Sequence, residues 1–176
     1  MAILGVDDFK SKLTGGGARP NLFKVTCNFP TYVGADVELA SFMVKAAQLP
    51  ASVLGLVEVP FRGRKLMMAG DRTFEPWTIS VLNDTDFAVR DAFEKWSNGI
   101  NAHSANTGLA NPTDYFADMI VEQLDNSGSV VKKYDFRGTW PSQVGAIELN
   151  YDEATAIEEF EVTWRYQHFE ASGVNF

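Results

Sequence analysis

The sequence has few residues of the kinds that carry chemistry, and each scarcity excludes a class of protein. A single cysteine, Cys27, allows no internal disulfide and no cysteine-based zinc site. The two histidines, His103 and His168, lack the spacing of a metal site or a metalloprotease. No signal-peptide pattern opens the chain, and no stretch approaches the ~18 consecutive apolar residues of a membrane helix. We therefore expect a soluble protein made in the cytoplasm.

The sequence also has fewer basic residues than acidic ones. The chain has 15 Lys and Arg against 23 Asp and Glu, a net charge of −8, which argues against binding nucleic acid by neutralising its phosphates. The charge is uneven, because residues 141–176 contain seven acids and one base, Arg165. These acids are Glu148, Asp152, Glu153, Glu158, Glu159, Glu161 and Glu170.

What is present indicates one folded domain. A chain of 176 residues, 45% hydrophobic and with 13 Phe, can bury a core without crosslinks. Gly15-Gly16-Gly17 resists a fixed backbone, so residues 1–17 are predicted to be a flexible arm that orders on assembly. We expect a single β domain over residues 18–170 and a C-terminal tail over residues 171–176.

Apolar residues alternate with polar ones along much of the chain, which predicts half-buried strands. The alternation is clearest over residues 160–166 and recurs over residues 77–81 and 147–151. Further strands are predicted at residues 22–29, 39–47, 53–59, 65–69, 115–124 and 130–139. Turns are predicted at residues 126–128 and 140–142.

One segment has a helical period. Residues 84–100 place Phe87, Phe93 and Trp96 on one side at steps of three and four, and Asn83 or Asp84 can cap the helix. We expect this face to pack in the core, the alternative being a surface that binds another protein. A long polar connection follows at residues 97–113. The sequence predicts a mainly β antiparallel protein with one α-helix.

No residue constellation supports catalysis, and we predict neither an enzyme nor a bound cofactor or metal. Cys27 alternates with Val25 and Phe29, as a small core residue does. About nine strands in one small domain leave edges with unpaired backbone groups, which favours self-assembly. The alternative is a closed barrel that covers its own edges, such as a monomeric ligand carrier.

Several ordered motifs resemble the tail tube proteins of contractile-tailed, T-even-like bacteriophages. The most specific is Arg64-Lys65, then Ala69-Gly70-Asp71-Arg72-Thr73-Phe74, then Trp77-Thr78-Ile79-Ser80-Val81-Leu82-Asn83-Asp84. Residues 18–23, 49–50, 138–145 and 160–163 agree in the same order, so that the resemblance covers residues 18–166.

The resemblance implies an antiparallel β-sandwich or barrel-like tail-tube fold, with sheets joining between subunits in a hexameric ring. Stacked rings would form the inner tail tube of the virion, the channel for DNA ejection. The implied partners are other copies, the tail sheath protein, the baseplate hub, and the tape measure and tail terminator proteins, with DNA passing without specific binding. An inner tube of a type VI secretion or pyocin-like system is the alternative within assembly.

Two sets of residues become candidates once the resemblance is accepted. Carboxylates on polar strand faces would repel DNA from the channel wall, and the candidates are Glu148, Glu159 and Glu161. The resemblance implies that a hairpin over residues 54–72 reaches the next ring. Its charged residues are the candidate ring-stacking contacts: Glu58, Arg62, Arg64, Lys65, Asp71 and Arg72.

Overall fold

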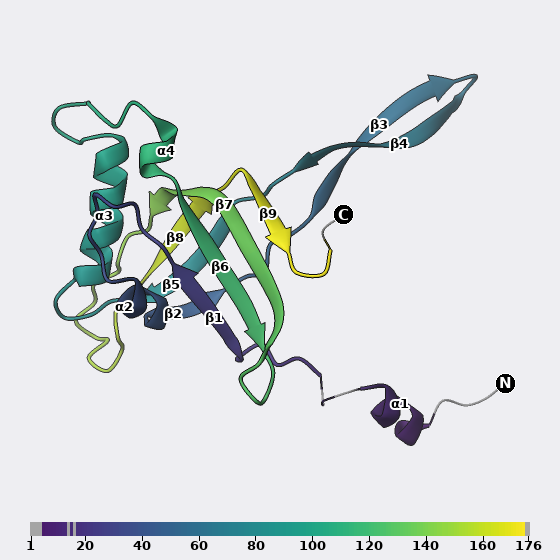
Figure 1. The fold of residues 1–176 in the computed structure, drawn as a ribbon, viewed down its shortest axis with the longest axis horizontal. Helices are drawn as coiled ribbons and strands as arrows, with labels where there is room; N and C mark the ends of the chain where they lie inside the picture. Colours follow the sequence, from purple (N-terminus) through teal and green to yellow (C-terminus); the bar gives the residue numbers. More distant parts are fainter. Residues whose placement is uncertain (1–4, 14, 16, 175–176) are drawn as a thin grey trace.

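The chain folds into one seven-stranded antiparallel sheet, a separate two-stranded hairpin and four helices, seen in a computed structural model that describes residues 5–13, 15 and 17–174 (Figure 1). In chain order the elements are α1 Val6–Lys12, β1 Phe23–Cys27, α2 Val37–Phe42, β2 Val44–Ala47, β3 Val53–Phe61, β4 Arg64–Thr73, β5 Trp77–Leu82, α3 Ala88–Ile100, α4 Pro112–Tyr115, β6 Ala117–Leu124, β7 Val130–Val144, β8 Glu159–Arg165 and β9 His168–Ala171. The mainly β prediction is confirmed, although the helices number more than one.

Strand β7 joins the two halves of the large sheet. The strand order is β1-β6-β7-β8-β5-β2, with β9 also pairing β7. The first part of β7 pairs with β6 as far as Thr139, opposite Ala117, and the last part pairs with β8 from Trp140, opposite Arg165. One half therefore contains β1, β6, β9 and the start of β7, whereas the other contains the end of β7, β8, β5 and β2.

Aromatic side chains fill the space between the sheet and α3. Trp96 of α3 is fully buried, lies 5.2 Å from the ring of Trp164, and donates from its indole nitrogen to the carbonyl oxygen of Tyr115 at 2.8 Å. Between the two half-sheets, Trp77 of β5 stacks on Phe136 of β7 at 4.5 Å. The predicted core face of the helix is confirmed for Phe93 and Trp96 and wrong for Phe87, which caps α3 at φ 56° and is exposed.

The strand predicted over residues 39–47 is wrong in its first half. Residues 37–42 form helix α2, because the Asp36 carboxylate accepts hydrogen bonds from the backbone N–H groups of Glu38 and Leu39 and caps the first turn. Only Val44–Ala47 form a strand, β2, which pairs with β5.

Two other expectations are corrected near the C-terminus. Residues 147–151 form no strand, since they belong to an exposed loop over residues 145–158, here called the acidic loop. Residues 140–142 form no turn but continue β7. Pro141 is tolerated there because this part of β7 pairs only with β8 within the described residues, so the missing N–H breaks no ladder.

The predicted arm over residues 1–17 is described in part. Residues 6–12 form α1, which buries none of its side chains, whereas residues 1–4, 14 and 16 lie outside the described part of the chain, as do residues 175–176. None of the described helices combines the length and apolarity needed to span a membrane.

Candidate functional site

The β3–β4 hairpin projects from the body of the molecule (Figure 1). Its strands pair from Val53 opposite Thr73 to Phe61 opposite Arg64, and within the described residues they pair with no other strand. Arg62 and Gly63 form the tip, and both have positive φ (45° and 79°). A two-residue turn needs positive φ at both positions if its twist is to match that of the two strands. An isolated hairpin of this length is not stabilised by a sheet of its own, so other contacts must hold it.

One face of the hairpin is apolar. Directly opposed residues of two strands point to the same side, and three such pairs are Val57 with Met68, Val59 with Leu66, and Phe61 with Arg64. The apolar hairpin face is defined as Val57, Val59, Phe61, Leu66 and Met68, whose exposed fractions run from 41% to 69%. A contiguous apolar patch of this kind on a projecting element is typical of a surface that another molecule covers.

The other face of the hairpin is mixed. It contains Met67 opposite Glu58, and the Glu58 carboxylate forms an ion pair with Lys65 on the same face. Arg72 donates to the Ser52 hydroxyl at 2.7 Å. Some of the charged side chains of the hairpin are therefore already paired with groups of the same subunit.

The six predicted stacking residues all lie on this hairpin and are all exposed: Glu58, Arg62, Arg64, Lys65, Asp71 and Arg72. Four of the six are basic, so the hairpin is locally positive in an acidic chain.

A polar face covers the outer side of the half-sheet made by β2, β5 and β8. Along β8 the side chains of Phe160, Val162 and Trp164 are buried, whereas the alternate residues face outward. The polar sheet face is defined as Lys45, Thr78, Ser80, Glu159, Glu161, Thr163 and Arg165. Lys45 pairs with Glu159 at 2.5 Å, and the hydroxyls of Thr78 and Thr163 lie 3.2 Å apart.

The structure separates the predicted channel residues into two places. Glu159 and Glu161 share the polar sheet face, whereas Glu148 lies in the acidic loop, about ten residues before them in the chain. Lys45 and Arg165 balance the two carboxylates, so the face is polar and carries both signs.

The acidic loop curves around an open hollow of about 680 Å³, and every residue that lines this hollow belongs to the loop except Glu159, which follows it. Leu149, Tyr151 and Ile157 line this hollow, and all three are exposed. The loop also contains Glu148, Asp152, Glu153 and Glu158 and no lysine or arginine, a net charge of −4. Apolar side chains in an acidic, concave surface are a second candidate contact, and the sequence prediction of a strand here missed it.

Both ends of the acidic loop are fixed. At its start, the N–H of Gly145 donates to the carbonyl oxygen of Glu161 at 2.6 Å, and Arg90 of α3 donates to the carbonyl oxygen of Gly145 at 2.8 Å. At its end, the Asn83 amide donates to the Glu158 carboxylate at 3.0 Å. The loop is therefore held at both ends by contacts with the body.

The single thiol lies apart from these surfaces. Cys27 is buried in the core, as predicted, and burial raises the pKa of its thiol to about 12. A thiol that stays protonated and is closed to solvent is no nucleophile.

The sequence matches the family model described as "Phage tail tube protein" over residues 18–172. It is 37% identical over 167 residues to the tail tube protein gp19 of Enterobacteria phage T4, a match that covers 94% of this chain and 99% of that protein. It is 30% identical over 165 residues to the tail tube protein of Serratia phage KSP90, covering 92% of this chain and 93% of that protein.

Solved structures share the fold at low sequence identity. A chain of the PVC extracellular contractile injection system, in its extended sheath-tube complex, superposes with a TM-score of 0.66 at 12% identity, covering 92% of this chain and 95% of that one. A chain of the anti-feeding prophage cap superposes with a TM-score of 0.64 at 15% identity, covering 88% and 89%. These likenesses show a shared fold.

Proposed function

The chain belongs to the phage tail tube protein family and forms the inner tail tube of a contractile-tailed virion, and we propose from this premise that it does so as stacked hexameric rings. The family is structural, so the chain is not an enzyme. Family membership also sets aside the two alternatives, a type VI or pyocin-like inner tube and a monomeric ligand carrier.

Two unpaired strand edges support a ring. In the half-sheet β7-β8-β5-β2, the outer edge of β2 and the edge of residues 140–144 of β7 pair with no further strand in the described structure. An open groove of about 560 Å³, between α3 and residues 140–144, runs beside the second edge. Because the two edges lie on opposite sides of the half-sheet, joining copies edge to edge is a heterologous contact, which closes into a ring by rotation.

The polar sheet face is the proposed channel wall, with Glu159 and Glu161 as its carboxylates. The face has as many basic as acidic residues and so no net charge to attract phosphate, and the ion pair with Glu159 reduces the attraction that Lys45 would exert on DNA. DNA then passes without being held. Glu148 was expected on the same wall. Because it lies in the acidic loop, we assign it instead to the negative charge of that loop.

The hairpin is the proposed contact between rings. Charge reversal at Arg64 or Arg72 should shorten tubes and leave the fold of the subunit unchanged, because both side chains are exposed. Reversal at Lys24, an exposed basic residue of β1, is the matched control.

We also propose the partners implied by tube membership: the tail sheath protein, the baseplate hub, and the tape measure and tail terminator proteins. Chains of similar fold occur in a sheath-tube complex, a tube cap and a baseplate, which supports sheath and end contacts for this chain.

Electron cryo-microscopy of the polymerised protein tests this function. The expected reconstruction has sixfold rings, with Glu159 and Glu161 on the inner wall. A protein that stays monomeric at high concentration would argue against the stacked rings. Carboxylates on the outer wall would remove only the channel assignment.

A further inference from the structure

We infer that the apolar hairpin face of one copy seats in the acidic-loop hollow of a copy in the next ring. This inference rests on the proposed stacking of rings and names the two surfaces that meet. The occupant of the hollow is the hairpin of a second copy.

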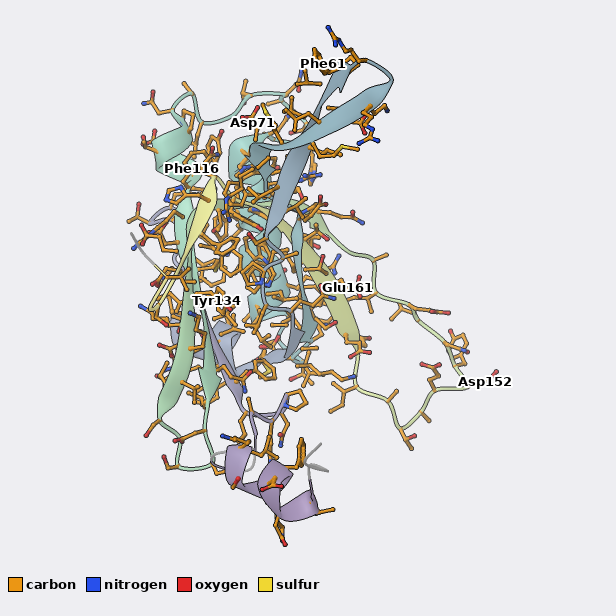
Figure 2. All side chains as sticks on the ribbon, turned by 90° about the vertical axis from the view of Figure 1, so that its right-hand side faces the viewer. Phe61, Asp71, Phe116, Tyr134, Asp152 and Glu161 are labelled. Atoms are coloured by element: carbon orange, nitrogen blue, oxygen red, sulfur yellow. The ribbon has the colours of Figure 1, made fainter. Side chains whose placement is uncertain are left out.

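The two surfaces lie at opposite ends of the same strand pair. β5 begins at Trp77, four residues after the last residue of the hairpin, and ends at Leu82 opposite Glu159, the residue that follows the acidic loop. Six residues of strand span about 20 Å. Figures 1 and 2 agree, since the hairpin, with Phe61 near its tip, and the acidic loop, with Asp152, project away from each other.

The surfaces match in shape and polarity. The apolar hairpin face presents five exposed apolar side chains on a projecting element, and the acidic loop lines an open hollow with three, Leu149, Tyr151 and Ile157. Covering both patches would remove apolar surface from water on each partner, which is the main favourable term in protein association.

The surfaces also match in charge. The six charged stacking residues of the hairpin have a net charge of +2, whereas the acidic loop has a net charge of −4. Arg64 lies on the same side of the hairpin as the apolar face, opposite Phe61, so that a basic residue accompanies the apolar patch into the acidic hollow. Complementary charge fixes orientation and register in such contacts. Two hairpins facing each other would instead bring like charges together.

A contact between different surfaces at opposite ends of a subunit propagates. Each copy that presents its hairpin to one neighbour leaves its own hollow free for another, so the contact repeats along an axis and stays open at both ends of the polymer. Arg90 and Asn83 anchor the acidic loop at its two ends. Binding of the hairpin to this loop therefore costs less conformational entropy than binding to an unanchored loop would.

Two adjacent methionines give a matched test. Met67 and Met68 are 55% and 47% exposed, but only Met68 belongs to the apolar hairpin face. Met68→Glu should raise the concentration needed for tube growth roughly tenfold or more, because it places an unpaired carboxylate in an apolar, acidic contact. Met67→Glu, with the same charge change one residue away, should stay within roughly twofold of the unsubstituted protein. Both variants should unfold at the same temperature as that protein.

The outcomes separate the two proposals. If the unsubstituted protein forms no stacked rings, the proposed function fails. If it forms tubes and Met68→Glu also does so at the same concentration, or if both glutamate variants block growth equally, this inference fails and the proposed function stands.

Crosslinking identifies the occupant directly. Copies with Leu66→Cys, mixed with copies with Tyr151→Cys and oxidised after assembly, should form disulfide-linked pairs of one copy of each variant. The same experiment with Met67→Cys in place of Leu66→Cys should give few pairs. Equal yields from the two mixtures would overturn the inference. The native Cys27 is buried and does not compete.

Discussion

The guanidinium group of Arg90 donates a hydrogen bond to the carbonyl oxygen of Gly145 at 2.8 Å. The same group pairs with Glu94 at 2.8 Å and lies 5.0 Å from the centre of the Phe160 ring. One side chain of α3 therefore fixes the point where β7 ends and the acidic loop begins.

Arg90→Met should loosen the start of the acidic loop. The variant keeps an apolar stem beside Phe160 but loses the hydrogen bond to Gly145, so amide hydrogen exchange in residues 145–158 should speed up. The free energy of unfolding should fall by about 1.5–3 kcal/mol, the usual contribution of a hydrogen bond to a charged group. Arg90→Lys, which keeps the charge, should give a smaller effect. Unchanged exchange in this loop would contradict the anchoring role.

Trp96→Ala should cost about 3–5 kcal/mol of unfolding free energy, because it leaves a cavity beside Trp164 and an unpaired carbonyl at Tyr115. Urea unfolding measures the change. Lys95→Ala, on the exposed side of the same helix, is the control and should change the free energy by less than about 0.5 kcal/mol.

Stability should fall in alkaline solution partly through Cys27. Its thiol has a folded-state pKa raised from 9.0 to about 12 by burial, so above pH 9 the unfolded chain loses a proton that the folded chain keeps. The thiol's contribution to stability is complete below pH 9 and is lost as the pH rises toward 12. At pH 10 the loss should be about 1 kcal/mol relative to neutral pH.

Urea unfolding of the unsubstituted protein and of Cys27→Ala at both pH values isolates this effect. Tyr32, whose pKa is also raised to about 12 by burial, is present in both proteins and cancels in the comparison. The same pH dependence in both proteins would show that the thiol does not contribute.

Asp36→Ala should destabilise the protein by about 0.5–2 kcal/mol through the loss of the α2 cap. Asp36→Asn keeps an acceptor oxygen for the N–H groups of Glu38 and Leu39 and should cost less. Urea unfolding of the two variants checks the order, and a larger loss for Asn than for Ala would contradict the capping role.

The central strands were predictable because the rest of the chain buries only one face of each strand and leaves the other face open. Along β8, Phe160, Val162 and Trp164 are buried and the residues between them are not, so their period of two is visible in the sequence. The same holds for β5 from Trp77 onward. In α3 the buried residues recur at helical spacing.

Residues 147–151 show the limit of this reasoning. Ile147, Leu149 and Tyr151 alternate as in a strand, yet Leu149 and Tyr151 are exposed in the subunit. A pattern of apolar residues indicates that a surface is covered, but it does not say whether the same chain or another copy covers it.

The hairpin surfaces were predictable only in part. The charged candidate stacking residues were named from a family resemblance and stay a prediction, whereas defining the apolar hairpin face needed the strand register. Leu66, Met67 and Met68 are consecutive apolar residues, and only the pairing of Met68 with Val57 and Met67 with Glu58 assigns them to different sides.

The length of β7 has a mechanical consequence. Its 15 residues extend about 50 Å and belong first to the half-sheet with β6 and then to the half-sheet with β8. Moving one half-sheet relative to the other must therefore distort the backbone of β7 in addition to disturbing the side chains packed between them. A force applied to one half-sheet therefore reaches the other through peptide bonds as well as through side-chain contacts.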